Sequence, residues 1–197
     1  MANGDWFIYE MEGNVAVLTL NHPDSMNIVN QELFTELHEL QNKIEADPSV
    51  RAVVIKANGP HFSAGIDLKL LNTIGSTFVA ENLNFLQRLY GRWQEWHIPV
   101  VAAIHGICYG SAVELILGCD IRVAADDLKI AIPEVRFGLS PDMGGTVRLT
   151  QLVGLGQAKR LILGCEELDA AEAKEIGLVE IVVPRDKLEE RAIKLAK

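Results

Sequence analysis

The pattern of apolar and polar positions along the chain predicts an alternation of strands and helices. Two short runs, over residues 7–10 and 14–20, read as strands joined by a turn at Glu12-Gly13, which makes them a hairpin. Apolar residues then recur at helical spacing from Leu33 to Ile44, until Asp47-Pro48 ends the run. Residues 52–57 are mostly β-branched and apolar, which predicts a strand covered on both faces.

The same alternation continues through the rest of the chain. Further helices are predicted over about 78–96, 111–117, 147–152, 157–163, 170–175 and from 187 to 197, and further strands over 100–104, 121–124 and 179–183. Strand, loop, helix and strand in succession are typical of a parallel sheet covered by helices. The sequence therefore predicts the α/β fold class.

Composition narrows the class of protein. The chain has 197 residues, of which 49% are hydrophobic, which is enough to bury a core of about one domain. The net charge of −9 and the lack of a basic stripe argue against a nucleic-acid partner, because such proteins neutralise phosphates with Lys and Arg. The histidines show no HxxxH or Cys/His clustering, so we expect no metal site.

The cysteines and the N-terminal residues predict the compartment. Cys108, Cys119 and Cys165 are far apart and odd in number, which fits a reducing environment. The first twenty residues lack the pattern of a signal peptide, and no apolar run has transmembrane length. We therefore expect a cytoplasmic protein with no membrane partner; an organelle entered with a removed transit peptide is the alternative.

Three motifs carry candidate chemistry, and the first is His61-Phe62-Ser63-Ala64-Gly65-Ile66-Asp67-Leu68. It follows the buried strand at 52–57, and its small residues would let a ligand approach the backbone closely. A tight strand-to-helix turn with no ligand is the alternative interpretation.

The second motif spans residues 104–115, where a strand runs through His105-Gly106 and a small-residue turn into an apolar helix. Free N–H groups at a helix start can bind an anion. The alternative is that Ser111 and Glu114 form a capping box, in which Glu114 only satisfies the helix start.

The third motif spans residues 132–146. Glu134 lies between apolar residues, which is costly for a charge unless it is paired, protonated or used. Asp142 follows Pro141 and precedes Gly144-Gly145, so ordinary turn chemistry could explain it.

Taken together, in this order and spacing, the three motifs resemble the crotonase (enoyl-CoA hydratase/isomerase) superfamily, from about residue 6 to residue 183. Asn21-His22-Pro23 with Asn27 looks like the family's early CoA-contacting loop, and residues 168–173 with Gly177-Leu178-Val179 are similar to its late signature. The resemblance implies a crotonase-like spiral of strand-strand-helix units with a helical C-terminal part. Residues 1–183 would form the acyl-CoA-binding core, and residues 184–197 would start a C-terminal helical region that is cut short.

The resemblance also implies a reaction and its residues. The backbone N–H groups of Ile66 and Ser111 would bind the oxygen of a thioester enolate, each contributing about 3 kcal/mol to the transition state. Glu114 would be the base that activates water, and Glu134 the acid that protonates C2. The residues implied to contact substrate or CoA are Met26, Asn27, Ser63, Ala64, Gly65, Asp67, Leu68, Lys69 and Gly110. A CoA thioester would be the substrate, with no retained cofactor.

Two features leave alternatives open. Asp142 stands where hydratases of the family usually have a small residue, and dienoyl-CoA isomerases are similar in having three acids; we favour hydration because position 114 is Glu. Ser111-Ala112 departs from the family's usual Gly run, so a non-catalytic binding or assembly module on the same fold is the rival of another class. The family also implies a homotrimer or hexamer, provided that the C-terminal helices are present.

Overall fold

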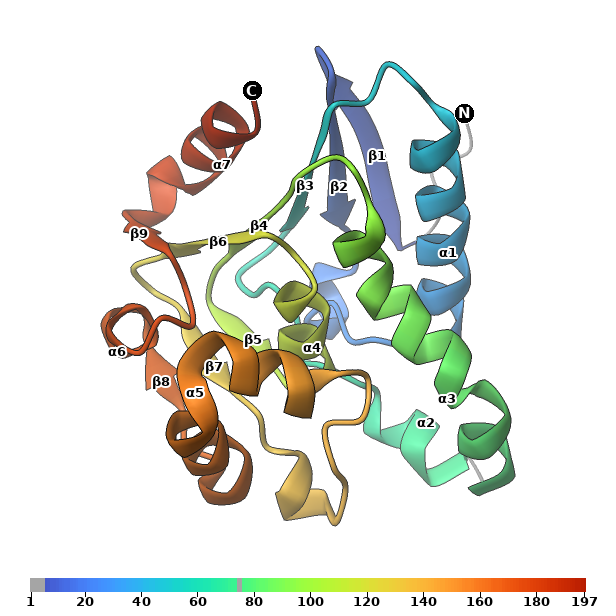
Figure 1. Cartoon of the computed structure of the whole chain (residues 1–197), viewed down its shortest axis with the longest axis vertical. Coiled ribbons are helices and arrows are strands. Elements are labelled where there is room, and N and C mark those ends of the chain that lie inside the picture. Colours follow the sequence, from blue (N-terminus) through green and yellow to red (C-terminus); the bar gives the residue numbers. More distant parts are fainter. Residues whose placement is uncertain (1–5, 74–75) are drawn as a thin grey trace.

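The computed structural model describes residues 6–73 and 76–197, and it contains two sheets surrounded by helices (Figure 1). The larger sheet has the order β1-β2-β3-β4-β6-β9, and its strands are β1 (Phe7–Glu12), β2 (Val15–Leu20), β3 (Ala52–Ala57), β4 (Val100–Ile104), β6 (Ile121–Ala125) and β9 (Ile181–Val183). The smaller sheet has the order β5-β7-β8, formed by β5 (Ile107–Tyr109), β7 (Lys129–Ala131) and β8 (Leu168–Asp169). Strands β1 and β2 pair antiparallel, and every later pair of the larger sheet is parallel.

The helices lie on both sides of the larger sheet (Figure 1). They are α1 (Gln31–Ala46), α2 (Leu68–Thr73), α3 (Ser76–Gly91), α4 (Ser111–Leu117), α5 (Gly145–Gly164), α6 (Ala170–Glu175) and α7 (Leu188–Ala196). The regular structure of the described residues also includes four short 3-10 helices, η1 (Pro23–Ser25), η2 (Arg92–Glu95), η3 (Glu134–Phe137) and η4 (Arg185–Lys187).

The larger sheet is buried on both faces because alternate residues of its strands enter two different cores. In β3, Val53 and Ile55 belong to the main core, whereas Ala52 and Val54 belong to a second core. Helix α7 covers that second core with Leu188, Ala192 and Ile193. A parallel sheet needs cover on both faces, which explains the continuous apolar run that the sequence shows at β3.

Most predicted elements are confirmed, with differences that have local causes. The helix predicted over 78–96 is α3 followed by η2, and the last predicted strand begins only at Ile181. The two helices predicted over 147–163 form one span, α5, which is interrupted at Gly154 with φ 80° and ψ 159°. The α/β class is confirmed, whereas the two- and three-residue strands of the smaller sheet were not predicted.

The chain folds so that the three motifs meet. The segment after β3 bridges to β5 through Ser63 and Cys108, and β5 pairs with β7, which leads into the third motif. The loop after β2 joins the same place, because Val29 bridges to Ile66. The motifs therefore lie side by side although they are far apart in sequence.

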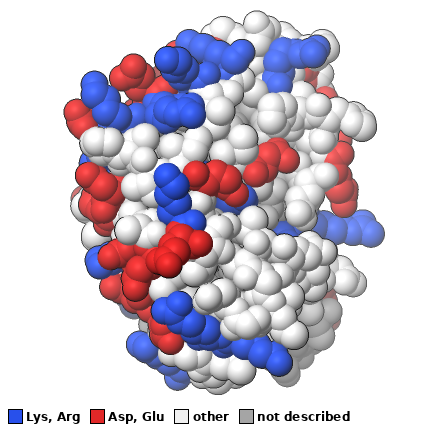
Figure 2. Space-filling view, turned by 60° about the vertical axis from the view of Figure 1, so that its left-hand side comes forward, with Lys and Arg blue, Asp and Glu red and all other residues white. Residues whose placement is uncertain are grey.

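The surface carries charges of both signs. Figure 2 shows Lys and Arg interspersed with Asp and Glu on the face turned toward the viewer, with a broad uncharged area at its lower right. No helix in the described residues is long and apolar enough to cross a membrane.

Candidate active site

The first two motifs are joined by backbone hydrogen bonds. Ser63 N donates to Ile107 O at 3.0 Å, and Tyr109 N donates to Ser63 O at 3.1 Å. Gly65 has φ +86°, and a Cβ there would lie 2.5 Å from Tyr109 O and 3.5 Å from Ser111 N. Only glycine permits this close approach of the two turns.

The two N–H groups predicted to bind an oxyanion therefore lie on adjacent turns. Around them, Asp67 N donates to Val29 O and Gly110 N donates to Ala131 O, both at 2.9 Å. These bonds fix the turns and use neither the Ile66 N–H nor the Ser111 N–H. The structure brings the predicted pair together, and its role stays a prediction.

The capping-box interpretation of Glu114 is wrong. The N-cap of α4 is Gly110, with φ 55°, and no side chain caps this helix. Instead, Glu114 Oε1 accepts hydrogen bonds from Met143 N at 2.8 Å and from Gly145 N at 2.9 Å. The carboxyl of Glu114 thus points across the fold to the third motif.

Glu114 is only 1% exposed, and its environment favours the protonated form. Its pKa is raised to about 8, mainly by burial; the nearby charges of Glu134 and Asp142 also raise it, and the two backbone N–H bonds lower it. A buried carboxyl that holds its proton near neutral pH is a candidate acid or base.

Glu134 begins η3 and lies against the start of α4. A Cβ on Gly110 would be 3.0 Å from Glu134 Oε1, so the Glu134 carboxyl can occupy this position because Gly110 has no side chain. Among the described residues, Oε2 of Glu134 is buried without a hydrogen-bond partner. Burial, with a contribution from Asp142, raises the pKa of Glu134 to about 7.

Asp142 lies in the turn that precedes α5. The residue is exposed to solvent, yet the protein around its carboxyl raises its pKa by desolvation. Its charge raises the pKa of both Glu114 and Glu134. The three predicted carboxylates are therefore close enough to repel one another.

The loop predicted to contact CoA is tied to the first motif. Ala64 N donates to Met26 O at 3.0 Å, and Ser63 Oγ donates to Asn27 O at 2.7 Å. The Asn27 side chain is 1% exposed; it accepts from His22 N and donates to Asn58 O and His61 O. Asn27 thus holds the loops together, whereas the Met26 side chain is exposed at their edge.

The remaining predicted contact residues lie at the start of α2. Asp67 Oδ1 accepts from Lys69 N at 2.8 Å and so stabilises the first turn of this helix. Leu68 and Lys69 are exposed, two and three residues after Ile66.

Sequence reasoning missed the backbone donors at Met143 and Gly145. The signal for them was present, because Gly144-Gly145 allows a chain to turn tightly before a helix, and Gly144 adopts φ 98° here. A Cβ at Gly145 would lie 2.7 Å from Glu114 Oε1, so this glycine admits the carboxyl.

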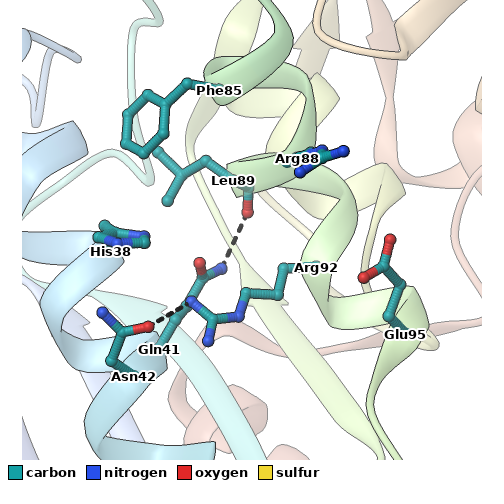
Figure 3. A pocket seen from close by; sticks show the side chains of 8 residues that line it. All are labelled: His38, Gln41, Asn42, Phe85, Arg88, Leu89, Arg92 and Glu95. Atoms are coloured by element: carbon teal, nitrogen blue, oxygen red, sulfur yellow. Dashed lines mark hydrogen bonds between the residues drawn. The ribbon is translucent and has the colours of Figure 1, made fainter.

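A hollow of about 570 Å³ lies elsewhere, between α1 and α3 (Figure 3). Its lining residues are His38, Gln41, Asn42, Phe85, Arg88, Leu89, Arg92 and Glu95, and none of the predicted site residues is among them. Gln41 Nε2 donates to Leu89 O, and Arg92 binds Asn42 and Glu45. These bonds join α1 to α3 and to η2.

The described residues contain no group of three or more His, Cys, Asp or Glu that could hold a metal ion.

Comparisons with known proteins agree on one family. The family model for enoyl-CoA hydratase/isomerase matches residues 10–197. The short-chain-enoyl-CoA hydratase of Clostridium acetobutylicum is 36% identical over 191 residues, which cover 96% of this chain and 73% of that protein. The crotonyl-CoA hydratase of Syntrophomonas wolfei subsp. wolfei is 35% identical, with coverage of 96% and 73%.

Solved structures give the same result. An enoyl-CoA hydratase from Bacillus anthracis superposes with a TM-score of 0.92 at 34% identity, covering 97% of this chain and 75% of that one. DspI of Pseudomonas aeruginosa superposes with a TM-score of 0.93 at 34% identity, covering 100% and 75%.

Proposed function

Because the chain belongs to the enoyl-CoA hydratase/isomerase family, we propose that it is an enoyl-CoA hydratase of the crotonase type, which adds water across a 2-enoyl-CoA double bond. The observation that supports the reaction is that the Glu134 carboxyl lies beside the turn at Gly110, while Glu114, on the helix that follows this turn, is near enough for the charge of Glu134 to raise its pKa.

The proposed mechanism uses backbone donors and two carboxyl groups. The N–H groups of Ile66 and Ser111 bind the thioester oxygen, where negative charge develops as the enolate forms. Ionised Glu114 takes a proton from water, whose oxygen attacks C3, and protonated Glu134 then donates its proton to C2. The reaction moves only protons and water, so it needs no resident cofactor.

CoA is proposed to bind along the edge formed by the first motif and the loop after η1. Met26, Leu68 and Lys69 are exposed there, whereas Gly65 and Ser63 are buried and shape the turn. The Lys69 ammonium would meet a CoA phosphate. Lys69→Met should then raise KM for the thioester and leave kcat nearly unchanged.

The pKa order of the two carboxyls predicts the pH profile. The base Glu114 has the higher pKa, about 8, and the acid Glu134 the lower, about 7. The active form, with Glu114 ionised and Glu134 protonated, is then about a tenth as abundant as the form in which Glu114 is protonated and Glu134 is ionised. We expect kcat/KM to rise up to about pH 7 and to fall above about pH 8. Because Glu114 and Glu134 titrate as a coupled pair, the two apparent pKa values of this profile describe the pair and not either residue alone.

Asp142 supports a second candidate, isomerisation of a dienoyl-CoA. Its charge acts on both other carboxyls, so a third group is near enough to take part in proton transfer. In that reaction one carboxyl removes a proton, the electrons move through the diene, and another carboxyl returns a proton at a distant carbon. No water oxygen enters the product.

One experiment separates the two reactions from each other and from a non-catalytic module. The protein is incubated with crotonyl-CoA and with a 3,5-dienoyl-CoA in water enriched in ¹⁸O, and products are followed by mass. Labelled 3-hydroxyacyl-CoA supports hydration, and an unlabelled isomer of the dienoyl substrate supports isomerisation. Binding of both thioesters with no turnover would contradict both proposals.

Variants test the assigned residues. Glu114→Gln and Glu134→Gln should each lower kcat for hydration by about 10²-fold or more, because general acid and base catalysis contribute that much. Asp142→Asn should spare hydration and abolish any isomerisation. Glu39→Gln, an exposed carboxylate on α1, is the matched control and should retain full activity.

A homotrimer or a hexamer is the proposed assembly. Helix α5 carries Val147, Leu155 and Leu163 with more than half of each side chain exposed, which offers apolar surface for contact. Light scattering of the purified protein tests this, and a mass of about 22 kDa at all concentrations would contradict it.

The cytoplasm is the proposed location. Cys108, Cys119 and Cys165 are all free thiols in the structure, which suits a reducing compartment. Fractionation of cells that express the native gene, with detection by antibody, tests this location.

A further inference from the structure

The backbone that binds Glu114 is itself held from its other side. Three successive carbonyls in the turn before α5 accept hydrogen bonds. Asp142 O accepts from Gln87 Nε2 at 2.8 Å, Met143 O from Arg148 Nη1 at 2.8 Å, and Gly144 O from Arg148 N at 3.0 Å. The turn is thus clamped between α3 and the first turn of α5.

Two peptide groups connect this clamp directly to the carboxyl. The peptide group between Asp142 and Met143 accepts from Gln87 on its carbonyl and donates to Glu114 through its N–H. The group between Gly144 and Gly145 accepts from the backbone N–H of Arg148, a bond that does not depend on the side chain at this position, and it also donates to Glu114. A hydrogen bond on the carbonyl of a planar peptide polarises its N–H, so each bond strengthens the other.

The guanidinium of Arg148 is fixed in place. Its Nε donates to Gln94 Oε1 at 2.7 Å, so both α5 and η2 contribute to its position. A Cβ on Gly91 would lie 2.5 Å from Nη2, and any side chain on Gly144 would overlap the guanidinium. Glycines at these positions leave room for the arginine, which also places a positive charge near Glu114.

We propose that Gln87 and Arg148 are positioning residues for the hydratase reaction, which hold the 142–145 backbone so that its N–H groups orient Glu114 and favour its ionised form. The catalytic consequence rests on the proposed function, whereas the effect on Glu114 itself does not. Neither residue needs to touch the substrate.

The kinetic test compares Arg148→Met, Arg148→Lys and Gln87→Met by pH profile. In Arg148→Met we expect the pKa of Glu114 to rise by about one pH unit, which moves the alkaline limb of the kcat/KM profile up by the same amount. The plateau of kcat/KM should fall about tenfold, because the form with Glu114 ionised and Glu134 protonated becomes ten times less abundant. The loss should be in kcat, with KM nearly unchanged. Arg148→Lys should recover part of the activity, and Gln87→Met should shift the same limb by less.

The control is Arg160→Met, which removes an arginine near the C-terminal end of α5 that forms an ion pair with Glu166, beyond the helix. It should leave both limbs in place. The proposal would be overturned if the limbs of the kcat/KM profile stayed at the wild-type pH in both Arg148→Met and Gln87→Met. A fall in kcat alone would not support it, because general destabilisation lowers kcat without shifting the pH profile.

A second measurement needs neither substrate nor activity. In protein labelled with ¹³C at the Glu carboxyls, the Glu114 signal is assigned by its absence in Glu114→Gln and titrated by NMR. Its midpoint should rise by about one pH unit in Arg148→Met and return toward the wild-type value in Arg148→Lys. A midpoint unchanged in Arg148→Met and Gln87→Met would overturn the proposal. A wild-type protein without hydration activity, but with the expected titrations, would contradict only the proposed function.

Discussion

At the scale of single residues, Glu114 combines a structural cost with a proposed chemical use. Its folded-state pKa of about 8 lies above the ordinary value of 4.5, mainly because of burial. The folded protein therefore keeps a proton that the unfolded chain gives up between these pH values. It follows that the contribution of Glu114 to stability is intact below about pH 4.5 and is lost as pH rises toward 8.

The first prediction is that Glu114→Gln stabilises the protein at alkaline pH. Glutamine can accept the same backbone bonds from Met143 and Gly145 without having to ionise. The difference in Tm between variant and wild type should grow from pH 5 to pH 8.5, at about 3 °C for each kcal/mol. Scanning calorimetry across this range measures it, with Glu39→Gln as control. A Tm difference that does not change with pH would contradict the pKa assignment.

At the scale of elements, the sequence predicts the helices and strands that have a clear pattern of apolar and polar residues within their own segment. The β-branched run gives β3, and the small-residue turn followed by an apolar run gives α4 with its observed bounds. Strands β5 and β7 have three residues each, too few for a periodic pattern, and they exist because they pair with each other.

The errors at the site have a common cause in long-range contacts. Ser111 and Glu114 have the spacing of a capping box, but two N–H groups 29 and 31 residues away bind Glu114 instead. The resemblance of the three motifs to the family could single out the carboxyls and the two turns as candidates. It could not reveal that Gly145 and Met143 complete the site, because no local pattern records a tertiary partner.

The second prediction concerns the contact between the two turns. Gly65→Ala places a methyl group 2.5 Å from Tyr109 O at φ +86°, so the turns must separate. We expect a loss of about 2 kcal/mol or more in unfolding free energy and a large fall in kcat, because the Ile66 and Ser111 donors move apart. Denaturant unfolding and hydration assays measure these effects.

Gly156→Ala is the control for this substitution. Gly156 lies in α5 with a φ that is not positive, and an added Cβ would meet no atom within 4 Å apart from its chain neighbours and the backbone of its own helix. This variant should be as stable as wild type or slightly more stable. Full activity in Gly65→Ala would contradict the paired-turn arrangement.

At the scale of the whole molecule, stability and chemistry depend on different parts. The proposed site lies between α4 and the turn before α5, against the main core. The second core lies on the other face of the larger sheet under α7, and ion pairs from Lys197 to Glu12 and from Lys56 to Glu189 join that helix to the strands. A change under α7 should therefore alter stability without altering catalysis.

The third prediction tests this separation with Ile193→Ala. Ile193 is 6% exposed and packs on the face that Val54 and Val101 line, so the truncation leaves a cavity and should cost about 2–4 kcal/mol. Tm should fall by several degrees, while kcat and KM for crotonyl-CoA at 25 °C should match wild type. Lys194→Ala, at the exposed neighbouring position, should change neither quantity. A fall in kcat at temperatures where Ile193→Ala is fully folded would mean that the two cores are coupled, since the sheet between them would then transmit the loss of packing to Glu114.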